Sequence, residues 1–169
     1  MTIDEAIRAA LQCEGRVVTV YRDAVDQCQD PIGKRIFQAL HEDEISHAHF
    51  LKEKLDELKE AGHIKPRVLA TAVPSSDKIE AAIKTFRSEV ATPVAETELI
   101  LLRRALAIEN ETSELYQKLV RELAAEDRTI FERFVEIEEG HRAIVQAEID
   151  SVTGTGFWFD IPEFRLEAG

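Results

Sequence analysis

Two segments of the chain carry the same set of potential metal-binding side chains at the same spacing. Each has a glutamate, a tyrosine seven residues later and a Glu-x-x-His motif further along. The glutamate–tyrosine pair recurs after 95 residues and the Glu-x-x-His motif after 94. The eight residues are Glu14, Tyr21, Glu44 and His47 in the first segment and Glu109, Tyr116, Glu138 and His141 in the second. Carboxylates and imidazoles without thiolates suit iron or manganese, and zinc would also bind.

Each of the four glutamates interrupts an apolar stripe of a predicted helix. Counting in steps of three and four residues, for example, Leu11 and Val18 flank Glu14 on the same helix face. An uncompensated buried carboxylate costs several kcal/mol, and four of them together would repel one another. Either protons or cations must neutralise these groups, and we favour cations. The six carboxylates and imidazoles are therefore the predicted metal ligands.

The helices that must position these ligands can be placed from their capping signals. Thr2 and Glu5 form a capping box, and Asp30 followed by Pro31 starts a second helix. Gly62 is a C-terminal signal for that helix. The long helices are expected at about residues 3–29, 31–61, 93–123 and 127–152, ending before Gly154, with a shorter one at about 77–89.

This order of elements predicts an all-α fold with two antiparallel helical hairpins. They would be joined by a long crossover, about residues 62–92, which is the topology of a ferritin-like four-helix bundle. Residues 153–169 contain several aromatic side chains and are expected to form a tail laid over the bundle. The whole chain, residues 1–169, is predicted to be a single domain.

The glutamates are also expected to lie at matching heights. Glu14 and Glu44 each lie about 15 residues, or about 22 Å of helix, from the turn between their two helices. Glu109 and Glu138 stand at a similar distance from theirs. The Glu-x-x-His spacing puts carboxylate and imidazole on one face of a helix, so all six ligands could meet at one metal pair. The tyrosine hydroxyls, two turns further along, could hydrogen-bond the ligand carboxylates.

Composition excludes several classes of protein. A net charge of −12 argues against nucleic acid as a partner, since phosphate binding needs a basic face. No apolar run approaches the roughly 20 residues of a membrane-spanning helix. The first residues lack the basic and apolar regions of a signal peptide, so we expect a cytoplasmic protein without membrane association.

The repeated motifs resemble the ferritin-like di-iron superfamily and, within it, the rubrerythrin family, over residues 3–152. The stretch 153–164, with Trp158 at its centre, is similar to the end of stand-alone rubrerythrin-like proteins. The resemblance implies two iron ions, with Glu14 and Glu109 as terminal ligands and Glu44 and Glu138 as bridging ligands. His47 and His141 would be the imidazole ligands, and Tyr21 and Tyr116 would stand beside the site.

Two departures from the rubrerythrin pattern matter. The chain has no Cys-x-x-Cys pair of a rubredoxin domain, because its two cysteines are Cys13 and Cys28. Electrons would then have to come from an external donor protein. Thr112 stands where rubrerythrins have a second glutamate one turn after the first, so the ligand set is closer to that of bacterioferritin.

The resulting hypothesis is an enzyme, a di-iron oxidoreductase that reduces hydrogen peroxide or dioxygen. No catalytic residues are expected beyond the metal ligands. One alternative is a ferroxidase that handles iron, and another is a non-catalytic scaffold stabilised by zinc or another redox-inert metal. The resemblance also suggests a homodimer.

Overall fold

The computed structural model describes residues 1–85, 95–156 and 158–159, and within these ranges it contains helices and no strands. Its five helices are α1 (Ile3–Gln27), α2 (Pro31–Ala61), α3 (Ser76–Thr85), α4 (Glu96–Glu122) and α5 (Ala125–Thr155). The predicted all-α class is confirmed. None of the described helices combines the length and the apolar character needed to cross a membrane.

The capping signals read from the sequence act as expected. Thr2 and Glu5 form a reciprocal capping box at the start of α1. The Asp30 carboxylate accepts hydrogen bonds from two backbone N–H groups in the first turn of α2. Gly62 and Gly156 end α2 and α5 with φ values of 74° and 81°, a left-handed conformation that glycine adopts without strain.

Several helix ends differ from the expectation, and the expected end of the short helix near residue 89 lies outside the described residues. α1 stops at Gln27 rather than near residue 29, because Cys28 already has an extended backbone. α4 begins at Glu96, after an extended Ala95, and the expected start at Thr92-Pro93 lies outside the described residues. α5 runs through Gly154 to Thr155, because the left-handed cap is supplied by the next glycine, at position 156.

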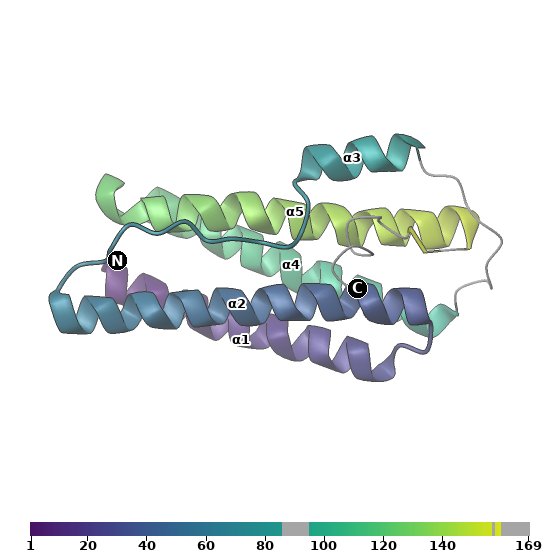
Figure 1. The fold of residues 1–169 in the computed structure, drawn as a ribbon, viewed down its shortest axis with the longest axis horizontal. Helices are drawn as coiled ribbons and strands as arrows, with labels where there is room; N and C mark the ends of the chain where they lie inside the picture. Colours follow the sequence, from purple (N-terminus) through teal and green to yellow (C-terminus); the bar gives the residue numbers. More distant parts are fainter. Residues whose placement is uncertain (86–94, 157, 160–169) are drawn as a thin grey trace.

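The four long helices lie alongside one another (Figure 1). α1 packs against α2, α4 packs against α5, and the two pairs meet through α1 and α4, while the short α3 packs on α5. The apolar core is divided into two clusters, one around Phe37 and the other around Phe134. On α1, Glu14 lies between Ala10 of the second cluster and Val17 of the first. Glu44, Glu109 and Glu138, on the other three long helices, lie at the same boundary.

The segment 62–75, which we call the strap, connects α2 to α3 without a helix or strand of its own. It runs along the molecule between α2 and α5 (Figure 1). The buried ammonium of Lys54 donates to the carbonyl oxygen of Lys65 at 2.8 Å. Gly140 allows close approach, because a Cβ atom there would lie 3.0 Å from the carbonyl oxygen of Pro74. The strap is thus fixed to both helices that it follows.

Two aromatic residues of the predicted tail pack on the helices, and residues 160–169 lie outside the described range. Trp158 is buried and meets the ring of Phe37 edge-on, with 5.9 Å between ring centroids. The backbone N–H of Phe159 donates to the buried carboxylate of Glu148 at 2.6 Å. For these two residues, the predicted aromatic cover over the helices is confirmed.

Replacing Gly33 by alanine is expected to displace Trp158, because the new Cβ would lie 2.2 Å from the indole ring. Such overpacking costs about 1–3 kcal/mol. Trp158 is the one tryptophan in the chain, so its fluorescence should shift to longer wavelength as the ring meets water. Gly15→Ala is the matched control, because nothing lies within 4 Å of its added Cβ. Unchanged emission from Gly33→Ala would contradict the described packing of the tail.

Candidate metal centre

Six fully buried side chains from four helices meet at the boundary between the two apolar clusters. They are Glu14 on α1, Glu44 and His47 on α2, Glu109 on α4, and Glu138 and His141 on α5. These are the six ligands predicted from the sequence, and the structure brings all of them together. Four carboxyl groups in an apolar interior need a compensating charge.

The six residues form two overlapping sets. Glu14, Glu44, His47 and Glu138 make up one set, and Glu44, Glu109, Glu138 and His141 make up the other. Within each set, one oxygen or nitrogen atom from every residue lies within 4.8 Å of the others. Glu44 and Glu138 belong to both sets, and each set also has a glutamate and a histidine of its own. These buried clusters could hold metal ions.

Both imidazoles turn the same nitrogen toward the carboxylates. Nδ1 of His47 lies 3.0 Å from Glu44, and Nδ1 of His141 lies 2.7 Å from the other oxygen of the same carboxylate. The two rings are nearly parallel, with 5.3 Å between centroids and 10° between planes. Nδ1 is therefore the nitrogen that each histidine could offer to a cation.

Asp43 is a buried member of this centre that the sequence analysis missed. Its Oδ2 lies 3.0 Å from Nε2 of His141 and 3.4 Å from Nε2 of His47. Asp43 directly precedes Glu44 and therefore stands off the apolar stripe that contains the predicted ligands. Its i,i+4 spacing to His47 was the one signal in the sequence that could have found it.

The two tyrosines hydrogen-bond carboxylates across the helix pair. The Tyr21 hydroxyl on α1 donates to Glu109 on α4, and the Tyr116 hydroxyl on α4 donates to Glu14 on α1. Both tyrosines are fully buried. Each hydroxyl thus holds a glutamate of the opposite helix rather than the glutamate seven residues before it. A hydrogen bond of this kind fixes the orientation of a ligand carboxylate.

Apolar rings exclude water from one side of the centre. Phe134 stacks on Tyr116 with 4.6 Å between centroids and meets His47 edge-on at 5.5 Å. Thr112, one turn after Glu109, is buried, but its hydroxyl donates to the carbonyl oxygen of Ile108 at 2.9 Å. Thr112 therefore supplies no additional carboxylate to the set.

Without a cation, protons must balance the charge of this centre. Burial, together with the neighbouring carboxylates, raises the pKa of Glu14 and Glu138 well above its usual range. Burial opposes ionisation of Glu44 too, but the charges of the two imidazoles outweigh it and lower its pKa. The pKa of His141 is raised well above its usual range, because the carboxylates outweigh the effect of burial. In the metal-free protein, protons on the glutamates and imidazoles thus balance the charge, and bound metal ions would replace these protons.

The pKa of Asp43 changes in the opposite direction to those of Glu14 and Glu138. Burial would raise it, but the hydrogen bond from His141, the close approach of His47 and the charges of both imidazoles outweigh burial and hold it well below its usual range. Asp43 is therefore an ionised carboxylate that accepts a hydrogen bond from His141 and lies close to Nε2 of His47.

The donor set fits divalent metal ions. Several buried ligand atoms lack a hydrogen-bond partner among the described residues, including one oxygen each of Glu14, Glu44 and Glu109 and both oxygens of Glu138. Buried polar atoms are normally satisfied, so a group of orphaned oxygens at one place indicates a missing charge partner. Oxygen and imidazole donors without thiolate favour iron, manganese or zinc.

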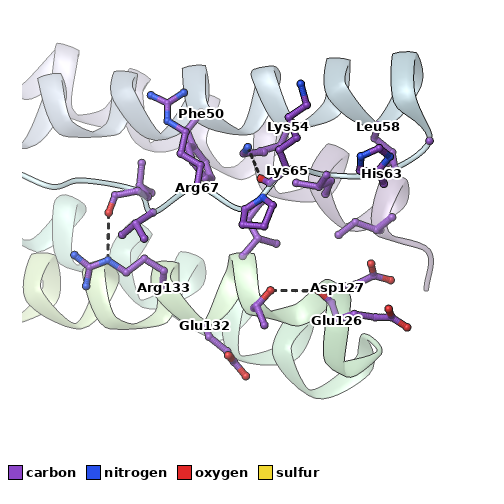
Figure 2. A pocket seen from close by; sticks show the side chains of 18 of the residues that line it. Phe50, Lys54, Leu58, His63, Lys65, Arg67, Glu126, Asp127, Glu132 and Arg133 are labelled. Atoms are coloured by element: carbon purple, nitrogen blue, oxygen red, sulfur yellow. Dashed lines mark hydrogen bonds between the residues drawn. The ribbon is translucent and has the colours of Figure 1, made fainter.

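A pocket of about 630 Å³ lies elsewhere, between the strap, the second half of α2 and the start of α5 (Figure 2). None of the six converging ligands lines it. Two of its charged residues are already paired, Lys54 with Glu57 and Arg67 with Glu53. The pocket is not part of the candidate metal centre.

Comparisons with protein-family models, with curated proteins and with solved structures gave no significant match.

Proposed function

We propose that this protein is a di-iron oxidoreductase of the rubrerythrin type, built on a ferritin-like four-helix bundle. It would reduce hydrogen peroxide or dioxygen with electrons from an external donor protein. The observation that carries the proposal is the pair of buried ligand sets that share Glu44 and Glu138. A shared pair of carboxylates between two separate Glu/His pairs is the arrangement expected of a carboxylate-bridged metal pair.

Each residue has a distinct role in this proposal. Glu14 and His47 would hold one metal ion, Glu109 and His141 would hold the other, and both shared glutamates would bridge the two. A bound iron pair would supply the electrons that reduce the oxidant, and the donor protein would restore them. The ligand helices fix the positions of the ions, and the surrounding aromatic rings keep water away.

The tyrosines orient the ligands that are not shared. Tyr116 and Tyr21 each donate to one oxygen of Glu14 and Glu109, and the second oxygen of each carboxylate has no hydrogen-bond partner among the described residues. This pre-organises the terminal ligands before any metal binds. A cytoplasmic location and a homodimer remain predictions that accompany the proposal.

Iron loading under anaerobic conditions tests the proposed function. We expect two Fe²⁺ ions per chain, rapid oxidation of both by hydrogen peroxide or dioxygen, and repeated turnover when a reductant is supplied. The measurement is metal analysis followed by stopped-flow absorbance. Protein that holds two irons which neither oxidant oxidises would contradict the proposal. Iron that accumulates well beyond two per chain during oxidation would favour ferroxidase activity instead.

A further inference from the structure

The strap lies over the side of the metal centre on which the Nε2 atoms of both histidines face Asp43. Two strap residues donate hydrogen bonds to Asp43. The hydroxyl of Thr71 donates to Oδ2, and the backbone N–H of Ala72 donates to Oδ1 at 3.0 Å. The Thr71 hydroxyl itself accepts from the N–H of Val73 at 3.0 Å, which fixes its direction. The strap and the two imidazoles are thus joined through one carboxylate.

Asp43 needs these donors to stay turned toward the imidazoles. It forms part of the wall of a pocket of about 520 Å³ between α2 and the strap. A carboxylate at such a wall can rotate and be hydrated instead, unless neighbouring groups fix it. With both oxygens held by the strap, Oδ2 lies within 3.4 Å of Nε2 on His47 and within 3.0 Å on His141.

An acceptor at Nε2 decides which nitrogen of a histidine can bind a metal. A carboxylate can only accept, so Nε2 of His141 must carry the hydrogen of its bond to Asp43. The unprotonated nitrogen available to a cation is then Nδ1, the atom that faces the glutamates. Asp43 therefore selects this tautomer in His141, and it faces the same nitrogen of His47 at 3.4 Å.

We propose that the strap, acting through Thr71 and Asp43, positions both imidazoles and thereby sets the metal affinity of the centre. The inference rests on the proposed metal centre but not on its redox activity. Asp43 and Thr71 are positioning residues, because they act on the ions through His47 and His141. The strap then contributes to metal binding, in addition to connecting α2 to α3.

The location of the strap does not depend on Thr71 alone. Lys54 holds the carbonyl oxygen of Lys65 at 2.8 Å, and Arg133 holds that of Leu69 at 3.3 Å. Pro74 packs closely on Gly140. Removing the Thr71 hydroxyl should therefore leave the strap in place and disturb mainly Asp43. Thr71→Val therefore tests the hydrogen bond to Asp43 without displacing the strap.

The experiment compares Zn²⁺ affinity among variants of the full chain, by competition with a chromophoric chelator. We expect Thr71→Val to weaken binding about tenfold, the effect of one hydrogen bond to a charged group. Asp43→Asn should weaken binding about 10–100-fold. Thr71→Ser keeps the hydroxyl and should stay within about twofold of the wild type. Lys54→Met removes a different anchor of the strap and serves as the control for general loosening.

A spectroscopic readout separates positioning from loss of structure. In protein labelled with ¹⁵N at histidine, the zinc-bound wild type should show His47 and His141 bound through Nδ1 with a hydrogen on Nε2. Thr71→Val and Asp43→Asn should disturb these signals, and Lys54→Met should not. Wild-type affinity and unchanged imidazole signals in Thr71→Val would overturn the inference. A wild-type protein that binds no Zn²⁺ would contradict the metal centre itself, and one that binds Zn²⁺ but never turns over with iron would contradict only the proposed function.

Discussion

Replacing Glu138 by glutamine is expected to weaken metal binding strongly while stabilising the metal-free fold. Glu138 belongs to both ligand sets, so the amide should weaken both sites. We expect a loss of affinity of more than about 100-fold, since changing only an outer partner of a ligand already costs about 10–100-fold. Isothermal titration with Zn²⁺ or anaerobic Fe²⁺ measures this loss.

The stabilising effect of the same change follows from charge. Burial and the neighbouring Glu44 and Glu109 raise the pKa of Glu138, so its ionised form is unfavourable in the metal-free fold. A neutral amide of nearly the same shape avoids both the repulsion of an ionised Glu138 and the uptake of a proton at pH 8, so the melting temperature of the metal-free protein should rise at that pH. If the substitution lowered this temperature, the charge repulsion that we infer would be wrong.

Glu148→Gln is the matched control for this experiment. Glu148 lies on the same helix and is also fully buried, but it accepts from the backbone of Phe159 and belongs to neither ligand set. We expect its amide variant to bind metal as the wild type does. Equal loss of binding in both variants would mean that any buried charge on α5 affects affinity, and the assignment of Glu138 as a shared ligand would fail.

The second large effect is the pH dependence of stability with and without metal. We expect the metal-free protein to lose stability as the pH rises above about 6.5, and the metal-loaded protein to lose little. The pKa values of Glu14, Glu109, Glu138, His47 and His141 are all raised in the fold, so the folded state keeps protons that the unfolded chain releases. Stability then falls as pH rises.

The two residues with lowered pKa do not reverse this decrease of stability with rising pH. Asp43 and Glu44 are already ionised in both states above about pH 6, so they contribute no slope there. They contribute stability that is lost only in acid, as the pH falls below the usual carboxyl range. The net slope from pH 6.5 to 8.5 is therefore set by the glutamates and histidines with raised pKa.

A bound metal replaces those protons, so stabilisation by metal should grow with pH. At free Zn²⁺ about 100 times the dissociation constant, each site adds about 2.7 kcal/mol. For a chain of this size that corresponds to about 5–11 °C in melting temperature per site. Thermal melts at pH 6.5, 7.5 and 8.5, with Zn²⁺ or with a chelator, measure the effect. A metal shift that shrinks as the pH rises would contradict it.

The ligands were predictable because their signal is local and repeated. A charged residue in an apolar stripe, such as Glu14 between Leu11 and Val18, stands out in any helix whose caps can be read. The helix starts at Thr2 and Asp30 were equally clear, because capping chemistry depends on neighbours in the sequence. The all-α class followed from the same signals.

The contacts between elements could not be predicted in the same way. The role of Asp43 depends on its contacts with Thr71 of the strap and with His141 on another helix. Neither contact produces a periodic pattern in the sequence. That Tyr21 donates to Glu109 rather than to Glu14 depends on how α1 packs against α4. The end of α5 was misplaced, because two glycines stand close together and only Gly156 adopts the left-handed conformation.

Anomalous X-ray diffraction from crystals of iron-loaded protein would locate the metal ions among the converging ligands. We expect two anomalous peaks in each chain. Both should lie between Glu44 and Glu138, one beside His47 and the other beside His141, each within bonding distance of an Nδ1 atom. An absence of peaks among these four side chains in protein shown to contain iron would contradict this expectation.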